Sequence, residues 1–208
     1  MLPSPMDRAR IQDTFDRLYE KVEGYPLSHQ ERNRLATEDS SLIYGEVIPE
    51  GFLDVLARTE PAAGETFYDL GSGTGRAVLL AAMAHPFRRL VGIEFLQALH
   101  DAAEGVHARF EAEVRPTLTA APAGQSITLC CGDFLETDFS DANVIFMQSN
   151  CFQPPLIKAL VKKFEALPSG VRILALGQFL NAAHLEQVET GPCELGWGDS
   201  FFALYRRR

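Results

Sequence analysis

The chain has 208 residues, 46% of them hydrophobic, and a formal net charge of −9. The acidic balance argues against nucleic acid as a required partner, because phosphate binding needs clustered Lys and Arg. No apolar run approaches the roughly 20 residues of a membrane helix, and residues 1–12 hold no apolar signal-peptide core. We therefore expect a cytoplasmic protein without membrane contact. The four cysteines and five histidines lack the spacing of metal ligands, so we expect reduced thiols and no metal.

The first 60 residues are predicted to form a helical cap. Residues 4–7 are typical of a helix start, and apolar residues at helical spacing follow as far as residue 22. Gly24-Tyr25-Pro26 is expected to end this helix. A capping box at residues 28–31 predicts a second helix that ends near residue 38, and residues 49–58 predict a third.

Strands and helices then alternate, which indicates an α/β fold. The expected strands are residues 66–70, 89–94, 126–131, 143–147 and 171–176, and the expected helices are residues 74–84, 96–114 and a segment from residue 154. Near-continuous apolar strands are typical of a parallel sheet with helices on both faces. Residues 194–205 predict a β-hairpin. Five parallel strands and a terminal hairpin resemble the class I methyltransferase (Rossmann-like) fold, with its mostly parallel seven-stranded sheet. We assign residues 1–60 to the helical cap and its loop, and residues 61–208 to this domain.

One stretch of this domain, Asp69-Leu70-Gly71-Ser72-Gly73-Thr74-Gly75, predicts a ligand site. It joins a strand to a helix, and its glycines let the backbone approach a ligand closely. The helix behind it presents unpaired N–H groups. The spacing is G-x-G-x-G with an acid two residues before the first glycine, whereas the dinucleotide fingerprint is G-x-G-x-x-G and has no such acid. Because a carboxylate would repel a pyrophosphate, the pattern favours a ligand without one.

Three acids, Asp69, Glu94 and Asp133, end three successive predicted strands, where open α/β sheets bind ligands. S-adenosylmethionine needs a carboxylate for its cationic amino-acid end and an acid that accepts both ribose hydroxyls. Its adenine needs a hydrogen-bond acceptor and an apolar face. Asp69 beside the glycines, Glu94, and Asp133 with Phe134 would supply these in turn. We therefore predict S-adenosylmethionine as the cofactor and S-adenosylhomocysteine as its product.

The motifs of this chain resemble one family in particular. Tyr44-Gly45-Glu46, the glycine stretch, Gly92-Ile93-Glu94 and Gly132-Asp133-Phe134 are similar to the disruptor-of-telomeric-silencing family, the non-SET histone-lysine methyltransferases. The resemblance covers residues 42–205 and implies that Tyr44 and Glu46 lie on a loop that folds over the methyl donor. The predicted donor-binding residues are then Tyr44, Glu46, Asp69, Gly71, Ser72, Gly73, Glu94, Phe95, Asp133 and Phe134.

The same resemblance predicts the acceptor side. That family has an Asn-Asn-Phe-Ala-Phe stretch lining its lysine channel, where this chain has Gln148-Ser149-Asn150-Cys151-Phe152. We predict Tyr44, Gln148, Asn150 and Phe152 as the catalytic residues. The implied function is methyl transfer to a lysine of an acceptor protein, histone or other, with no requirement for a nucleosome. Two alternatives stay open: a small-molecule N- or O-methyltransferase, and an S-adenosylmethionine-binding protein without catalysis.

Overall fold

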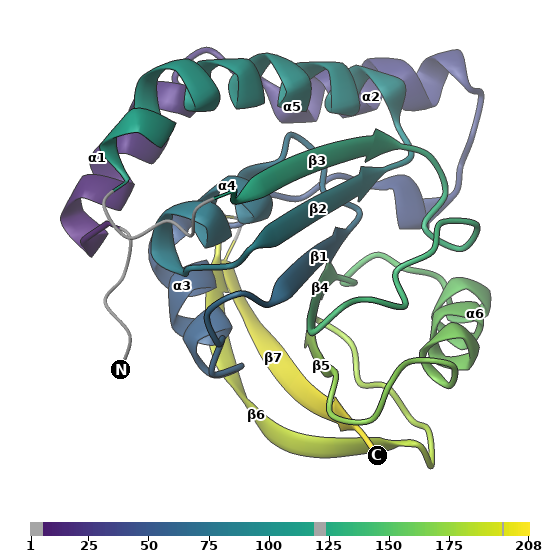
Figure 1. Cartoon of the computed structure of the whole chain (residues 1–208). Helices are drawn as coiled ribbons and strands as arrows, with labels where there is room; N and C mark the ends of the chain where they lie inside the picture. The colour runs from purple at the N-terminus through teal and green to yellow at the C-terminus, as the bar shows by residue number, and fades with distance from the viewer. Residues whose placement is uncertain (1–5, 119–123, 197) are drawn as a thin grey trace.

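A single mixed sheet organises the chain, whose computed structural model describes residues 6–118, 124–196 and 198–208. Its seven strands have the order β3-β2-β1-β4-β5-β7-β6 (Figure 1). The first five strands pair in parallel, and β7 pairs antiparallel with both β5 and β6. Their bounds are β1 Thr66–Leu70, β2 Arg89–Glu94, β3 Ser126–Cys131, β4 Val144–Gln148, β5 Arg172–Leu176, β6 Leu185–Leu195 and β7 Gly198–Arg207. The predicted α/β class and the seven-stranded, mostly parallel sheet with a terminal hairpin are confirmed.

Helices cover both faces of this sheet unequally (Figure 1). On one face lie α3 (Pro49–Ala57), α4 (Arg76–Ala84) and α5 (Gln97–Arg109), with α1 (Arg8–Tyr19) and α2 (Gly24–Arg34) packed outside them. On the other face lies α6 (Pro154–Phe164). Alternating side chains of β1 serve the two layers, since Phe67 joins one buried cluster and Tyr68 the other. Because α1 and α3 share a core with α4, the cap packs on the sheet domain; its division at residue 60 stays a prediction.

The N-terminal helices begin elsewhere than predicted. The expected start at Ser4 lies outside the described residues, and α1 begins at Arg8 after Asp7, whose carboxylate accepts the N–H of Arg10 at 3.0 Å. The predicted capping box at residue 28 is wrong, because α2 already begins at Gly24. Pro26 is tolerated in the first turn, where its missing N–H has no helical partner.

The terminal hairpin is longer than predicted. β6 begins nine residues before the expected start and carries an irregularity between Gln187 and Glu189. Six of its eleven residues are exposed because β6 is an edge strand, so it lacks the apolar run that marks the inner strands. Trp197, predicted as part of the hairpin, lies outside the described residues.

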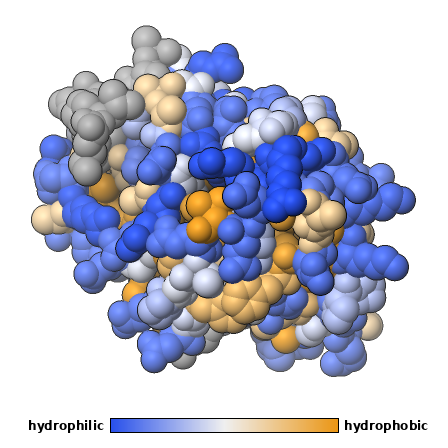
Figure 2. All heavy atoms as spheres, turned by 90° about the horizontal axis from the view of Figure 1, so that it is seen from below, coloured by the Kyte–Doolittle hydropathy of each residue, from blue (hydrophilic) through white to orange (hydrophobic). Residues whose placement is uncertain are grey.

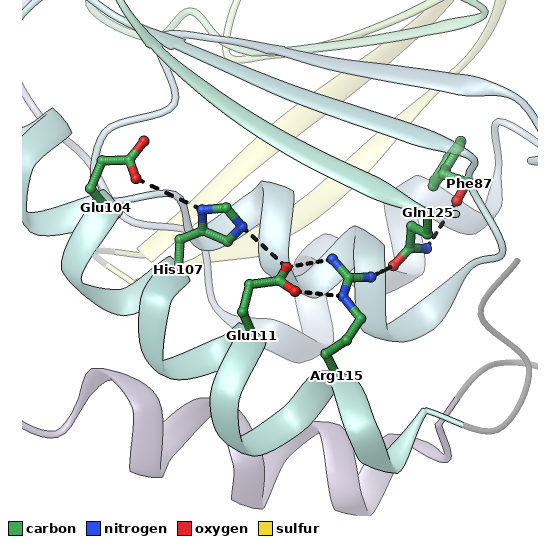
Figure 3. Close-up of polar contacts among 6 residues, drawn as sticks. All are labelled: Phe87, Glu104, His107, Glu111, Arg115 and Gln125. Atoms are coloured by element: carbon green, nitrogen blue, oxygen red, sulfur yellow. Dashed lines mark hydrogen bonds and ion pairs between the residues drawn. The ribbon is translucent and has the colours of Figure 1, made fainter. Parts of the chain in front are cut away.

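A chain of polar contacts holds the end of α5, which continues as a wider π-helical turn at Phe110–Val114 (Figure 3). His107 lies 3.9 Å from Glu104 and 3.2 Å from Glu111. Arg115 contacts the same Glu111 carboxylate at 2.9 Å and also donates to Gln125. The Gln125 amide donates in turn to the carbonyl of Phe87 at 2.9 Å. The contacts therefore tie α5 to the segments that enter β2 and β3.

The molecular surface seen from below the view of Figure 1 is mainly hydrophilic, with apolar residues grouped near the centre (Figure 2). Large exposed apolar side chains among the described residues include Phe95 and Phe179, at 50% and 57% exposure. Within the same residues, no helix is both long and apolar enough to cross a bilayer.

Candidate functional site

Three glycines with positive φ shape the turn after β1. Gly71, Gly73 and Gly75 have φ of 87°, 53° and 80°, a region in which other residues are strained. The N–H of Gly71 donates to the carbonyl of Ile93 at 2.9 Å, which ties the turn to β2. A Cβ on Gly73 would lie 2.4 Å from the Tyr44 ring. Glycine is therefore required at residue 73 for close approach, and α4 begins directly behind the turn.

Asp69 and Glu94 place two buried carboxylates on neighbouring strands, at 1% and 7% exposure. Glu94 accepts the N–H groups of Gly73 at 2.7 Å and Leu96 at 2.8 Å. Oδ1 of Asp69 has no hydrogen-bond partner among the described residues. Burial raises the pKa of both carboxyls; the Glu94 charge adds to the rise at Asp69, whereas backbone N–H groups oppose the rise at Glu94. Asp69 therefore offers a buried acceptor to a cationic ligand group.

The segment that carries Tyr44 and Glu46 lies across the glycine turn. The Tyr44 hydroxyl is 2.8 Å from Thr74 Oγ1 and donates to Glu46 at 3.1 Å. The other Glu46 oxygen pairs with Arg76 at 2.9 Å. Burial, and then the Glu46 charge, raise the pKa of Tyr44, so the phenol stays protonated at neutral pH. Tyr44 is therefore suited to donating a hydrogen bond and unsuited to acting as a base.

The end of β3 and the start of α5 border a wider hollow. Asp133 is exposed, and its Oδ1 accepts the N–H of Leu135 at 2.7 Å. Phe134 lies beside Phe152, with 5.9 Å between ring centroids, and Phe95 is half-exposed nearby. Asp133, Phe134 and Phe95 line a cavity of about 450 Å³, within the roughly 300–1,000 Å³ range of small-molecule sites. The hollow suits the flat, partly apolar end of a nucleoside.

Two narrow cavities continue from this hollow toward the glycine turn. One of about 70 Å³ lies between Glu94, Gly71 and Gln148, and one of about 20 Å³ between Asp69, Gly73 and Arg76. The predicted Ser72 is buried in the wall of the smaller one. The polar groups therefore match an amino acid joined to a nucleoside, but the inner cavities are too small for its amino-acid end. The segment at residues 41–46 has to shift for that end to enter.

The acceptor residues predicted from sequence are only partly brought together. Tyr44, Gln148 and Phe152 line the same cavity beside Gly71. Asn150 lies apart from this cavity, because its carboxamide packs against Gly177 and donates to Ser200 Oγ at 3.1 Å. Three of the four predicted residues therefore share one wall, and Asn150 braces the ends of β5 and β7.

Two residues of the site are absent from the sequence predictions. Arg76 lines the innermost cavity. In the sequence, the only sign of this role is that Arg76 is the one charged residue of α4, whose other eight residues are buried. Lys163 lies on α6, and its ammonium donates to the carbonyls of Phe134 and Leu135 at 2.9 and 2.7 Å and to that of Thr137 at 2.5 Å. Lys163 thereby holds the turn that presents Phe134, a role that a lysine on an amphipathic helix does not reveal in sequence.

The strand order, the antiparallel β7 and the acids that end β1 and β2 define a class I methyltransferase fold. One similar structure is an RNA methyltransferase from Salinibacter ruber, solved in complex with S-adenosyl-L-homocysteine. Its sequence is 25% identical and its TM-score is 0.56, and the match covers 77% of this chain and 94% of the Salinibacter chain. Another is magnesium protoporphyrin IX methyltransferase from Synechocystis PCC 6803, solved with bound SAM, with a TM-score of 0.56. The match covers 100% of this chain and 99% of the other, but the sequences are only 12% identical, so this likeness supports the fold alone.

Within that class, the chain belongs to the family of the histone methylation protein DOT1, whose family model matches residues 29–190. One relative is the "Histone-lysine N-methyltransferase, H3 lysine-79 specific" of Aspergillus fumigatus, which is 30% identical over 147 residues, or 68% of this chain. The match spans 28% of that relative's length. The resemblance predicted from the motifs is confirmed.

Proposed function

We propose that this chain is an S-adenosylmethionine-dependent methyltransferase that acts on a lysine side chain of a protein. The observation that carries the proposal is the pair of buried carboxylates, Asp69 and Glu94, on adjacent strands beside the glycine turn. Membership of the DOT1 family and the names of the relatives support a lysine acceptor. The chain matches only 28% of those relatives' length, so the substrate of the longer proteins does not transfer without a test.

The donor-side residues divide the binding work between three parts of the ligand. Asp69 accepts a hydrogen bond from the donor's ammonium, and Glu94 accepts the ribose hydroxyls. To do so, Glu94 gives up or shares the N–H groups it accepts from Gly73 and Leu96. Phe134 and Phe95 supply apolar surface for adenine in the 450 Å³ hollow. The bound donor supplies an electrophilic sulfonium methyl group.

The acceptor side is suited to orientation more than to proton transfer. Methyl transfer is an in-line displacement with a neutral leaving group, so alignment of the nucleophile is the main task. Gln148 and Phe152 line the cavity beside Gly71, where they would orient an acceptor amine toward a bound donor. Tyr44 stays protonated, so it does not take the amine's proton. The lysine therefore loses its proton to solvent, helped by apolar surroundings that lower its pKa.

The test is transfer of a labelled methyl group from S-adenosylmethionine into a cell lysate that is then separated into protein, RNA and small-molecule fractions. Core histones and nucleosomes are assayed beside it. We expect label in protein, on lysine by mass spectrometry. Label confined to RNA or to small molecules contradicts the lysine acceptor. Binding of S-adenosylhomocysteine without transfer to any fraction supports the non-catalytic alternative, and absence of binding contradicts the donor site itself. The cytoplasmic location also stays a prediction, which imaging of a tagged chain tests.

A further inference from the structure

The segment between β4 and α6, residues 149–153, carries Phe152 and is called the acceptor segment below. Its first residue, Ser149, is fully buried. The backbone N–H and the hydroxyl of Ser149 both donate to the carbonyl of Leu176 at the end of β5, at 2.9 and 2.8 Å. The side-chain amide of Gln178 donates to the carbonyl of Phe152 at 2.7 Å. On this side, the acceptor segment is therefore fixed to the end of β5 and the residues after it.

Two consecutive serines from the connection between α2 and α3 hold the other side of the acceptor segment. The hydroxyl of Ser40 donates to the carbonyl of Cys151 at 3.0 Å, and Ser41 Oγ accepts the N–H of Gln153 at 2.9 Å. We call these two contacts the serine clasp. They join residues that are 111 and 112 positions apart in the chain, and they lie on either side of Phe152 in sequence.

Local structure fixes the two serines. They belong to the short 3-10 helix η1 (Ser40–Leu42), which Asp39 precedes. The Asp39 carboxylate accepts the N–H of Ser41 at 2.8 Å, which is an N-cap. Both serines are partly buried. The cap holds the backbone that presents both hydroxyls, so the serine clasp has a defined geometry on both of its sides.

Phe152 lies where the donor and acceptor sides of the site meet. Its ring lines the cavity beside Gly71 and lies next to Phe134, which borders the wider hollow. Ser41 lines the cavity beside Gly71 as well. Phe152 is buried, and packed interiors transmit small displacements to their neighbours. A movement of the acceptor segment therefore changes the wall that both sides of the site share.

Donor entry moves one side of the serine clasp. The inner cavities are too small for the amino-acid end of the donor, so residues 41–46 shift when it enters. Ser41 belongs to this segment, and it stays bonded to Gln153 when the acceptor segment follows the shift. Breaking the serine clasp instead gives up two hydrogen bonds, which is unfavourable. The acceptor segment is therefore expected to follow, with Ser149 as its fixed end.

We propose that Ser40 and Ser41 are positioning residues. Through the serine clasp they carry the shift of residues 41–46 to the acceptor segment, so Phe152 takes the position that orients the acceptor only when the donor is bound. Donor binding thereby completes the wall of the acceptor side. This inference rests on the proposed function, because it describes the acceptor side of the same site.

The experiment follows the backbone amides of Cys151 and Gln153 by heteronuclear NMR, with and without S-adenosylhomocysteine. The chemical shift and the hydrogen-exchange rate of each amide are measured. Neither residue is among the described residues that line the three cavities of the site. The response of these amides therefore reports movement of the acceptor segment more than direct contact with the ligand.

The wild type is compared with the double variant Ser40→Ala/Ser41→Ala and with the milder Ser41→Ala. Ser41→Thr keeps a hydroxyl and tests rescue. The matched control is Ser169→Ala, since Ser169 is exposed and its hydroxyl donates to the carbonyl of Arg207 at 3.4 Å, outside the site. Calorimetry confirms that each variant binds S-adenosylhomocysteine, and circular dichroism confirms that it is folded.

We expect the ligand to shift both amide resonances in the wild type, in Ser41→Thr and in Ser169→Ala. In the double variant the ligand should still bind, but the shift of both resonances should largely disappear. In Ser41→Ala the response of the Gln153 amide should be reduced. In both alanine variants without ligand, this amide should exchange roughly 2- to 12-fold faster, which corresponds to the loss of one neutral hydrogen bond.

A full response of both amides in a folded, ligand-bound double variant overturns the inference, because the serine clasp is then only a structural brace. Wild-type amides that do not respond to bound ligand overturn it as well, as does a lost response in Ser41→Thr. In these cases the proposed function stands. Failure of the wild type to bind S-adenosylhomocysteine overturns the donor site and this inference together.

Discussion

Asp69→Asn is expected to change stability and donor binding in opposite directions. The wild-type carboxylate is 1% exposed, and its Oδ1 has no partner among the described residues. An unsatisfied buried polar group costs about 1–3 kcal/mol, and more when it is charged. Removing the charge while keeping the shape should therefore raise the free energy of unfolding at pH 8 by about 1–3 kcal/mol. At roughly 2–4 °C per kcal/mol for a chain of this length, Tm should rise by about 2–12 °C.

The sign of the pH dependence follows from the raised pKa of Asp69. Burial and the Glu94 charge raise it well above its ordinary value of 3.8, so the folded chain binds this proton more tightly than the unfolded chain. The stability that Asp69 contributes is full below 3.8 and is lost as pH rises through the raised folded value. The stability gained in Asp69→Asn should therefore be small near pH 4 and largest above that folded value.

Donor binding should weaken in the same variant, because the ligand ammonium loses its charged partner. A hydrogen bond to a charged group is worth about 1.5–3 kcal/mol, so the Kd for S-adenosylhomocysteine should rise by roughly 10- to 150-fold. Calorimetry gives Kd, and circular dichroism gives Tm at pH 4, 6 and 8. Asp54→Asn is the control, since Asp54 is 58% exposed and should shift stability by less than about 1 kcal/mol. Lower stability than wild type at pH 8, or unchanged Kd, refutes the reasoning.

Three further substitutions probe the rest of the site. Glu94→Ala should abolish measurable S-adenosylhomocysteine binding and lower stability by about 1–3 kcal/mol, because the N–H groups of Gly73 and Leu96 lose their acceptor; tight binding in calorimetry would contradict this. Lys163→Met should lower the free energy of unfolding in urea by about 1–3 kcal/mol, because the carbonyls of Phe134 and Leu135 lose their donor. The Kd for S-adenosylhomocysteine should rise because the turn that presents Phe134 is released, and an unchanged Kd would show that the turn does not need Lys163. Gln148→Ala should keep donor affinity and lose most methyl transfer in single-turnover assays, whereas full transfer would remove Gln148 from the acceptor site.

The inner strands were predictable because each is a short apolar run between turn signals. Strands β1, β2 and β3 have the predicted bounds, and β4 and β5 differ by one residue at one or both ends. The failures lie where local signals compete with packing. Ser28 and Glu31 have the spacing of a capping box, yet both are buried inside α2, which starts where Gly24 meets the Tyr44 ring. The first nine residues of β6 were missed because an exposed edge strand needs no apolar pattern.

The sequence by itself determined that the proposed donor-binding residues on β1 and β2 lie together. The glycines of residues 71–75 follow β1, and Asp69 and Glu94 lie at the carboxyl ends of β1 and β2. Parallel strands bring these ends to one edge of a sheet whatever packs around them. The tertiary structure alone decided the rest. Asn150 turns toward Ser200 and away from the cavity, and Arg76 is held by two rings of α1 more than 50 residues before it in the chain. Such placements depend on packing between distant segments, which no local pattern encodes.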